Sequence, residues 1–246
     1  MGETDPAPES YRAMRLRYER WMLEQKPWRL DLSTPRARLR AYWDLVFADH
    51  GVFRALYANR HRVSDRMWRS AQPGPGDIAW AARKGIKTIV NLRGARACGS
   101  YALEREAAAK RGLTLVDFSI GSREAPYRDA LEEAEKLFGA IAYPALMHCK
   151  SGADRAGFMS AFYLLVHEKR PLDEAVKQLS LRFGHMKSGK TGVLDHFFEA
   201  YAEDTASAPM PLMDWVRTRY DRKKVQDGFM GTWWANVIVD RILRRE

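Results

Sequence analysis

The sequence predicts an α/β protein in which a central, mainly parallel sheet is flanked by helices. From residue 66 onward, short β-branched or apolar runs alternate with helical patterns, as in strand–helix–strand units. The short apolar run at 144–149 suits a central strand. Residues 156–169 are apolar nearly all round, as expected of a helix buried in a large domain. With 246 residues, 46% of them hydrophobic, the chain can fill one substantial core.

The individual elements follow from local signals. A helix is expected over 77–85, because Asp77 stands near its start and Gly85 suits its carboxyl end. Pro126 fits the first turn of a helix over 125–142. The predicted strands are 66–73, 86–93, 113–120 and 144–149, and the predicted helices are 77–85, 100–112, 125–142, 156–169 and 171–184.

The two ends of the chain differ from the middle in composition. The expected units are a disordered tail over 1–10, a helical extension over 11–60, the main domain over 61–205 and a basic, aromatic helical extension over 206–246. Within the first extension, one helix should stop near Pro27, and a second should run from about residue 35 to 57. These helices mix arginines with tryptophan and tyrosine. They either pack outside the core with their charges in water or form a surface that touches lipid headgroups.

The charge balance favours acidic partners. The chain has 41 Lys and Arg against 31 Asp and Glu, a formal net charge of +10, and its pI is about 9.7. Phosphorylated ligands, anionic lipid surfaces and nucleic acid all fit this charge. No nucleic-acid reader motif is present, so we do not expect nucleic acid as a partner.

Cysteine usage and apolar runs bear on localisation. Cys98 and Cys149 are too few for a disulfide scaffold, which favours a reducing compartment. The N-terminal residues lack the apolar stretch of a signal peptide, and the run at 233–239 is too short to span a bilayer. The expected localisation is cytoplasmic, with a peripheral position at the inner face of the membrane left open.

The stretch LMHCKSGADRAG, residues 146–157, carries the clearest chemistry. A strand should end at His148 and a helix should begin near Arg155, so the loop lies at the carboxyl edge of the sheet, where α/β folds place their sites. The amide groups at a helix N-terminus attract anions, and small residues let the backbone curl around one. The predicted phosphate-binding residues are Lys150, Ser151, Gly152, Ala153 and Arg155.

The same environment should make Cys149 a thiolate nucleophile, because a helix N-terminus and a nearby arginine both favour negative charge. The planar guanidinium of Arg155 can hold two phosphoryl oxygens. Cys98 lacks this context, and we interpret it as structural or incidental.

A general acid must protonate the leaving oxygen. Asp154 is the first choice, because it stands beside Arg155; the alternative for Asp154 is a cap of the following helix. Asp117, after a predicted strand, and Glu124, in the next loop, are the reserves. His148 either holds the cysteine loop by hydrogen bonding or is a core histidine.

A basic segment follows the buried helix. Its residues Arg182, His185, Lys187 and Lys190 form either a second anion subsite on the rim of the pocket or a solvated basic loop. The sequence GKTG at 189–192 lacks the upstream glycine spacing of a nucleotide-binding loop.

These motifs resemble the cysteine-dependent phosphatase superfamily, in particular its atypical dual-specificity branch. HCKSGADRAG is similar to the signature of His, Cys, five residues and Arg. WRSAQP at 68–73 and GIKTIVNLR at 85–93 are similar to further elements of these proteins. FSIGSREAP at 118–126 resembles the general-acid loop of plant and fungal members that act on inositol pyrophosphates. The resemblance spans about residues 66–200, and it implies a protein tyrosine phosphatase-like fold.

Three positions depart from the commonest pattern. Ala156 stands where such proteins usually carry Ser or Thr, which helps the thiolate to leave. Asp154 stands directly before the Arg, and in this the loop resembles that of phosphatases of the myotubularin type. In those proteins the Asp at this place is a proposed acid. Lys150 is similar to the lysine in the loop of the phosphoinositide 3-phosphatase tumour suppressor, and it suits a substrate with several acidic groups.

We therefore expect a metal-independent phosphatase that hydrolyses phosphomonoesters through a cysteinyl-phosphate intermediate. The resemblance and the charge favour a phosphorylated lipid or saccharolipid headgroup, or an inositol phosphate, as substrate. The alternatives are a protein tyrosine or dual-specificity phosphatase acting on phosphoproteins and a catalytically inactive phosphate-binding module. No metal-ligand cluster is visible and no cofactor is expected. The oligomeric state is left open.

Overall fold

The structure is a computed structural model that describes residues 10–48 and 58–243. Apart from Ser10, the expected disordered tail over 1–10 lies outside the described residues. Ser10 caps the first helix, since its Oγ accepts a hydrogen bond from the amide of Ala13.

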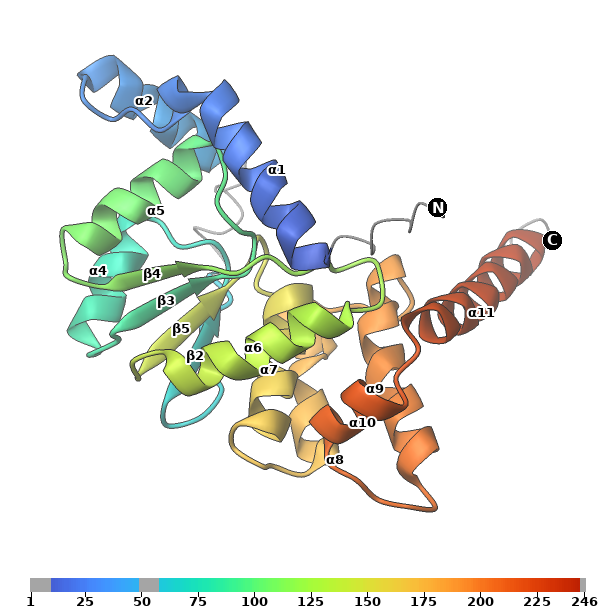
Figure 1. The fold of residues 1–246 in the computed structure, drawn as a ribbon. Coiled ribbons are helices and arrows are strands. Elements are labelled where there is room, and N and C mark those ends of the chain that lie inside the picture. Colours follow the sequence, from blue (N-terminus) through green and yellow to red (C-terminus); the bar gives the residue numbers. More distant parts are fainter. Residues whose placement is uncertain (1–9, 49–57, 244–246) are drawn as a thin grey trace, which may run out of the picture.

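The described chain contains a five-stranded sheet. Figure 1 shows its strands β2 to β5 with helices packed around them. Its strand order is β1-β2-β5-β3-β4, and every neighbouring pair is parallel except β1 and β2. The predicted α/β class with a mainly parallel sheet is confirmed. The strands are β1 His61–Arg62, β2 Met67–Ser70, β3 Thr88–Asn91, β4 Thr114–Asp117 and β5 Ala145–His148.

Successive side chains of a strand point to opposite faces of the sheet, and here apolar side chains stand on both faces. Helices therefore cover both faces. Ile89 and Leu146 pack with residues of α4 (Pro75–Arg83) and α5 (Gly99–Ala109). Their neighbours Val90 and Met147 belong to the larger cluster on the opposite face. That cluster is built largely from α6 (Arg128–Ala140), α7 (Asp154–Val166), α9 (Val193–Thr205) and α10 (Leu212–Thr218).

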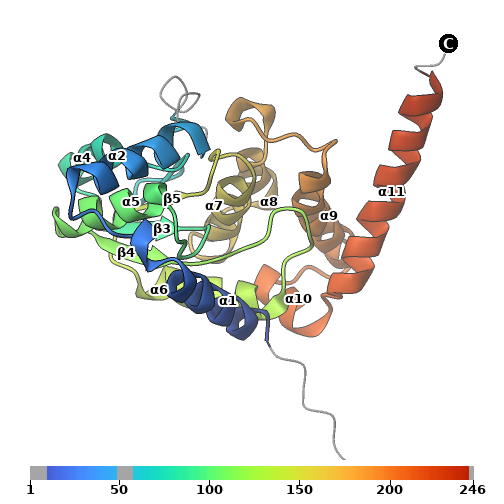
Figure 2. The ribbon, with the colours of Figure 1, turned by 90° about the horizontal axis from the view of Figure 1, so that it is seen from above.

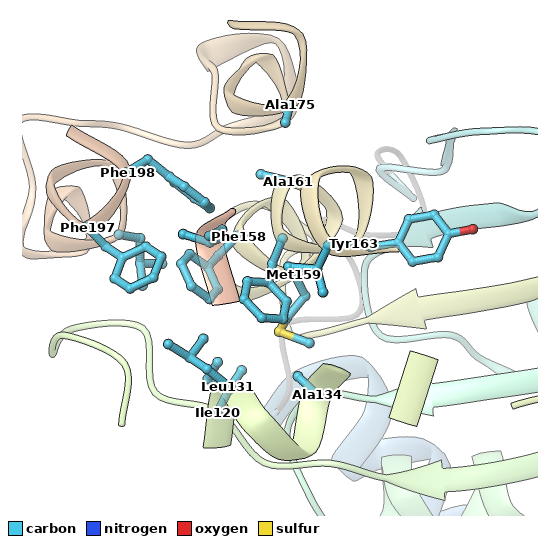
Figure 3. Close-up of a cluster of buried hydrophobic side chains, with 14 of the residues drawn as sticks. Ile120, Leu131, Ala134, Phe158, Met159, Ala161, Tyr163, Ala175, Phe197 and Phe198 are labelled. Carbon is cyan, nitrogen blue, oxygen red and sulfur yellow. The ribbon is translucent and has the colours of Figure 1, made fainter. Parts of the chain in front are cut away.

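Helix α7 lies at the centre of this larger cluster. Figure 3 shows Phe158 and Met159 of α7 above Leu131 of α6, with Phe197 of α9 on the far side of Phe158. Phe158 and Phe197 meet edge to face, with ring centroids 5.4 Å apart. The sequence prediction of a buried helix after the cysteine loop is therefore confirmed, and this packing fixes the position of the helix N-terminus at the site.

The predicted continuous helix over 171–184 is wrong. The chain forms α8 (Leu172–Ala175), then 3₁₀ turns at η3 (Val176–Gln178) and η4 (Leu181–Phe183). The buried Arg69 donates from Nη1 to the carbonyl oxygen of Gln178 at 2.6 Å. That carbonyl is therefore held by a distant side chain at the point where the helical path breaks off.

The N-terminal helices agree with the sequence as far as they are described. Helix α1 (Tyr11–Gln25) ends before Pro27, where the 3₁₀ turn η1 (Pro27–Arg29) begins. Helix α2 (Pro35–Trp43) continues as the π-helical turn η2 (Asp44–Ala48). The rest of the predicted second helix, up to residue 57, lies outside the described residues.

The C-terminal segment is helical, as predicted. Its α10 contributes Trp215 and Val216 to the main cluster, so this part of the segment is built into the core. Helix α11 (Arg222–Leu243) packs against α9 near its start and then extends away from the remaining structure (Figures 1 and 2). None of the described helices combines the length and apolarity needed to cross a bilayer. The domain boundaries at 60 and 205 stay predictions.

Candidate active site

The cysteine loop joins β5 to α7 at the carboxyl edge of the sheet. The strand register aligns His148 of β5 with Asn91 of β3 and Ser70 of β2 at this edge. Cys149 follows directly and is 2% exposed. Gly152 has a φ of +76°, and a Cβ there would lie 2.7 Å from the amide nitrogen of Ala71. Glycine is therefore required at this position for two reasons, the left-handed backbone and the lack of space.

Hydrogen bonds from the surrounding framework hold the carbonyl groups of the loop. Arg69 Nη2 donates to the oxygens of Gly152 at 2.6 Å and Ala153 at 3.0 Å. Asn59 Nδ2 donates to the oxygen of Ser151 at 2.9 Å, and the Gln72 amide donates to that of Lys150 at 3.2 Å. Four consecutive carbonyls are thus engaged on the side of the loop that faces β2.

The amides and cations of the loop are not engaged in this way. Within the described chain, the amides of Lys150, Ser151 and Gly152 have no protein acceptor. In the same part of the chain, neither the ammonium of Lys150 nor the half-buried guanidinium of Arg155 has a hydrogen-bonding or ion-pair partner. The loop therefore combines satisfied carbonyls with unused donors and two cations, which is the arrangement of an anion-binding nest.

Arg69 should carry a large share of the stability of this loop. It is fully buried, and its guanidinium lies 4.2 Å from the ring centroid of Phe183 in addition to its carbonyl bonds. Arg69→Gln should lower the free energy of unfolding by about 3 kcal/mol, because buried carbonyls lose a charged donor. Denaturant titration measures this change. Arg62→Gln, an exposed arginine on β1, is the matched control and should change it by less than about 0.5 kcal/mol. Equal effects of the two variants would contradict the role of Arg69.

A buried polar network supports the loop from below. Nε2 of His148 lies 2.6 Å from Oε1 of Glu104, and both side chains are fully buried. Gln72 Nε2 donates to the other oxygen of Glu104 at 2.6 Å, and Arg93 Nη1 donates to Gln72 Oε1 at 2.6 Å. The motifs at 68–73 and 85–93 are therefore joined through Gln72 and Arg93, and His148 is a fully buried histidine beside Glu104.

Asp154, the first choice for the general acid, belongs to a triad with two residues from the following segment. His185 Nδ1 lies 2.8 Å from Asp154 Oδ1, and His185 Nε2 lies 2.6 Å from Asp195 Oδ2. Burial alone lowers the pKa of His185, but the hydrogen bonds and charges of the two aspartates outweigh it and raise the pKa to about 9. Below about pH 9 an imidazolium therefore donates to Asp154, a bond that the ionised carboxylate accepts.

The triad predicts a specific pH dependence of stability. Because the folded-state pKa of His185 is raised above its unfolded value of 6.5, its contribution is complete below about pH 6.5 and is lost as pH rises through about 9. The free energy of unfolding should therefore fall across this window more steeply for the wild type than for His185→Gln. Denaturant titrations at several pH values measure both slopes. His196→Gln, a partly exposed histidine on α9, should keep the wild-type slope; a wild-type slope in His185→Gln would refute the triad.

The two reserve acids have different surroundings. Asp117 ends β4, where Tyr101 OH donates to its Oδ2 at 2.6 Å and Asn91 Nδ2 donates to its Oδ1 at 2.8 Å. Burial raises the pKa of Asp117 despite these hydrogen bonds, which oppose the shift. Glu124 is instead held by Arg222 of α11, with Nη2 2.8 Å from Oε2.

The predicted rim residues do not form one exposed group. His185 was expected on the rim, but it is 2% exposed, because Asp154 and Asp195 enclose it; this expectation is corrected. Lys187 pairs with Glu199 of α9. The other two lie over aromatic rings. Arg182 Cζ is 5.6 Å from the ring centroid of Phe183, and Lys190 Nζ is 5.3 Å from that of Trp233.

Both terminal segments hold the loop between β4 and α6. From α1, the ring of Tyr11 stacks on Tyr127 with centroids 4.1 Å apart, and Arg15 Nη2 donates to Ser119 Oγ at 2.5 Å. From the C-terminal side, Tyr220 OH donates to the Pro126 carbonyl at 2.6 Å. Sequence reasoning did not anticipate these contacts, because each joins residues about a hundred positions apart.

Helix α1 also reaches the loop after β3. The buried carboxylate of Glu19 accepts a hydrogen bond from the amide of Ala95 at 3.2 Å. A groove of about 520 Å³ runs beside this contact, between α1 and the strand ends. It is lined by Leu16, Glu19, Arg20, Leu23, Glu24, Ala95 and Asp117. One wall of this groove, which includes Asp117, is therefore supplied by the N-terminal helix.

The fold and the site together define a phosphatase of the protein tyrosine and dual-specificity class. Its marks are a central parallel strand, a loop that begins with Cys149 and ends at Arg155, and a buried helix that follows. A family comparison is more specific. The model of the DSP-PTPase phosphatases fused to NAD⁺ kinase matches residues 45–193, and the chain belongs to this family. The resemblance predicted from the sequence motifs is confirmed.

Several solved structures are similar to this chain. TpbA of P. aeruginosa is 19% identical, with 70% of this chain and 91% of TpbA covered and a TM-score of 0.46. Tk-PTP in its active form is 20% identical, with 58% of this chain and 98% of Tk-PTP covered and a TM-score of 0.46. A mouse putative dual specificity phosphatase is 16% identical, with 61% of this chain and 91% of the mouse protein covered and a TM-score of 0.44. No curated protein matches the sequence significantly.

Proposed function

We propose that this phosphatase hydrolyses phosphomonoesters through a covalent intermediate on Cys149. The observation that carries the proposal is the state of the cysteine loop. Its carbonyls are bound by Arg69, Asn59 and the Gln72 amide, while three of its amides, those of residues 150–152, and the side chains of Lys150 and Arg155 have no protein partner in the described chain. A phosphoryl group would supply the acceptors that these donors lack.

The chemistry proceeds in two displacements at phosphorus. In the first, the thiolate of Cys149 forms an S–P bond while the P–O bond to the leaving group breaks and an acid gives its proton to that oxygen. In the second, a water oxygen attacks phosphorus and the S–P bond breaks. This releases inorganic phosphate and the thiolate, and the ionised acid accepts the proton from water. Arg155 and the loop amides stabilise the charge on the equatorial oxygens in both steps.

We propose Asp117 as the general acid and a positioning role for Asp154. An acid must hold its proton before the first step, and burial favours the protonated form of Asp117. Asp154 instead accepts a hydrogen bond from His185, which also contacts Asp195. In this account the His185–Asp195 pair holds Asp154 and so fixes the start of α7, from which Arg155 extends.

Matched variants distinguish the two aspartates. Asp117→Asn should slow hydrolysis of esters with poor leaving groups by about 100-fold and of good leaving groups far less, because only the former need a proton. Asp154→Asn should slow both kinds of ester by similar factors, since it disturbs the loop. The value of kcat/KM for a series of aryl and alkyl phosphates, which reports the first displacement and not the hydrolysis of the intermediate, measures both. If the leaving-group dependence appears in Asp154→Asn and not in Asp117→Asn, the assignment is reversed.

We propose that the substrate is a small phosphorylated molecule with more than one acidic group, such as a phosphorylated lipid headgroup or an inositol phosphate. Two cations in one short loop, Lys150 and Arg155, support this choice, together with the net charge of +10. A single phosphoryl group needs one guanidinium clamp, and Lys150 is available for a neighbouring phosphate.

The substrate class is tested by comparing kcat/KM on three substrates: a phosphotyrosine peptide, a soluble inositol phosphate and a phosphorylated lipid in vesicles. Either of the last two should exceed the peptide by at least about tenfold. Lys150→Gln should reduce this preference and leave the rate on the peptide less affected. A peptide preference that survives Lys150→Gln would instead favour a protein phosphatase.

A further inference from the structure

Exposed apolar side chains are concentrated at one end of the described chain. The large hydrophobic residues with high exposure include nine within residues 14–47 and, elsewhere in the described part, Leu181 and Met186. Leu39 is 62% exposed, Trp43 57% and Trp21 54%. Such a concentration on a folded protein marks an interaction surface.

These residues follow helical spacing on two elements. On α1, Met14, Tyr18 and Trp21 lie three to four residues apart, so they share one face. On α2 and η2, Leu39, Tyr42, Trp43 and Phe47 do the same. We call these seven residues, together with Trp28 of η1, the α1–α2 face.

An arginine connects Trp28 of η1 to α2. Arg40 Nη2 of α2 donates to the carbonyl oxygen of Trp28 at 2.7 Å, and its guanidinium lies 4.7 Å from the Trp28 ring centroid. Within α2 and η2, the rings of Trp43 and Phe47 lie 4.1 Å apart. The exposed rings are therefore held in place by contacts within the folded chain.

The charges around the α1–α2 face are mainly positive. In residues 10–47, the exposed acidic side chains are Glu24 and Asp31. Two other acids there are engaged with the protein, since Glu19 is buried and Asp44 accepts a hydrogen bond from the Gly99 amide at 3.0 Å. The exposed basic side chains are Arg17, Arg20, Lys26, Arg36 and Arg40.

We propose that the α1–α2 face docks on an anionic lipid bilayer. Tryptophan and tyrosine favour the boundary between headgroups and acyl chains, where an apolar ring and a polar edge are both accommodated. Arginine and lysine beside them bury their stems and keep their charges at the headgroups, and anionic lipids attract them further. The combination of protruding rings with charge of one sign fits this partner.

Helix α1 links the docking face to the site. One side of it carries Met14, Tyr18 and Trp21, while Leu16 and Glu19 line the groove shared with Asp117. By helical spacing these two sets lie on opposite sides of α1, so the groove and the docking face are carried by the same helix but do not adjoin. The consequence for substrate choice rests on the proposed function: a docked enzyme meets phosphorylated headgroups at the membrane surface.

Vesicle co-sedimentation tests the docking without any turnover. Cys149→Ser protein should bind vesicles of phosphatidylcholine with phosphatidylserine at least about tenfold more tightly than vesicles of phosphatidylcholine alone, and added salt should weaken the binding. In the same background, the double variant Trp21→Gln, Trp43→Gln and the double variant Lys26→Glu, Arg36→Glu should each lower the affinity by about tenfold or more.

Two control variants carry matched changes elsewhere. Leu181→Gln removes an exposed apolar side chain and Lys84→Glu reverses an exposed charge, and both should bind vesicles like the parent protein. Equal binding to both vesicle types, no binding, or insensitivity to both double variants would overturn the docking proposal. So would a result in which the tryptophan variant changes only self-association in sedimentation velocity, since the face would then bind protein.

Activity measurements distinguish failure of the proposed catalytic function from failure of the docking proposal. Trp21→Gln, Trp43→Gln in the otherwise wild-type chain should keep the wild-type rate on a soluble aryl phosphate and lose rate on a vesicle-borne phospholipid. A wild-type protein that binds anionic vesicles but hydrolyses no phosphate ester would retain the docking site and refute the catalytic proposal.

Discussion

Cys149→Ser should lower the rate of aryl phosphate hydrolysis by about four orders of magnitude or more, because the hydroxyl is a far weaker nucleophile than the thiolate in a site with no neighbouring base assigned to activate it. The fold should be unaffected, since serine fills nearly the same volume in a loop whose carbonyls remain bound by Arg69 and Asn59. The measurement is the initial rate at saturating substrate, with circular dichroism and denaturant titration as checks of folding.

The chain offers a matched control in its other cysteine. Cys98 occupies the position before the first turn of α5, with its Sγ 3.3 Å from Ser100 Oγ, and Cys98→Ser should keep the wild-type rate. If Cys149→Ser hydrolyses the ester at the wild-type rate, the covalent mechanism is wrong. If the wild type itself binds phosphate but shows no turnover on any ester, the loop is a phosphate-binding module.

Arg155→Lys should lower kcat by about 100- to 1,000-fold. A lysine keeps the charge but replaces a planar pair of donors with a single point charge, so it cannot hold two equatorial oxygens through the transition state. The loss should appear in kcat more than in KM, because the charge on those oxygens grows along the reaction.

The control for this change is Arg83→Lys, which alters an exposed arginine in the last turn of α4. It should leave kcat and KM within about twofold of the wild type, as ordinary surface substitutions have small effects. A lysine at 155 that retains full kcat would show that the arginine binds substrate only through its charge, contrary to the proposed clamp.

Local pattern was sufficient to predict the framework of the fold. The strands at 88–91 and 145–148 and the helix at 154–166 were predictable because their side chains are apolar in the periodicities that burial demands. The segment 171–184 was not predictable in the same way. There the helical pattern gives way to 3₁₀ turns, and the Gln178 carbonyl is bound by Arg69, a residue about a hundred positions earlier.

The site shows the same division between local and distant causes. The loop position of Cys149 and Arg155 follows from adjacent elements, so sequence alone placed it. His185 looked like part of a basic rim, because its partners Asp154 and Asp195 become neighbours only in the folded chain. Glu104 gave no signal either: within the helical pattern at 100–112 nothing separates it from Glu106, which pairs with Arg38 at the surface.

Trapping of the intermediate tests the central claim most directly. Asp117→Asn protein, mixed with an aryl phosphate that has a good leaving group and quenched in acid within milliseconds, should gain the mass of one phosphoryl group, and peptide mapping should place it on Cys149. The same experiment with Cys149→Ser should show no gain of phosphoryl mass on the protein. Turnover without any phosphorylated form, or a phosphoryl group mapped to another residue, would contradict the cysteinyl-phosphate mechanism.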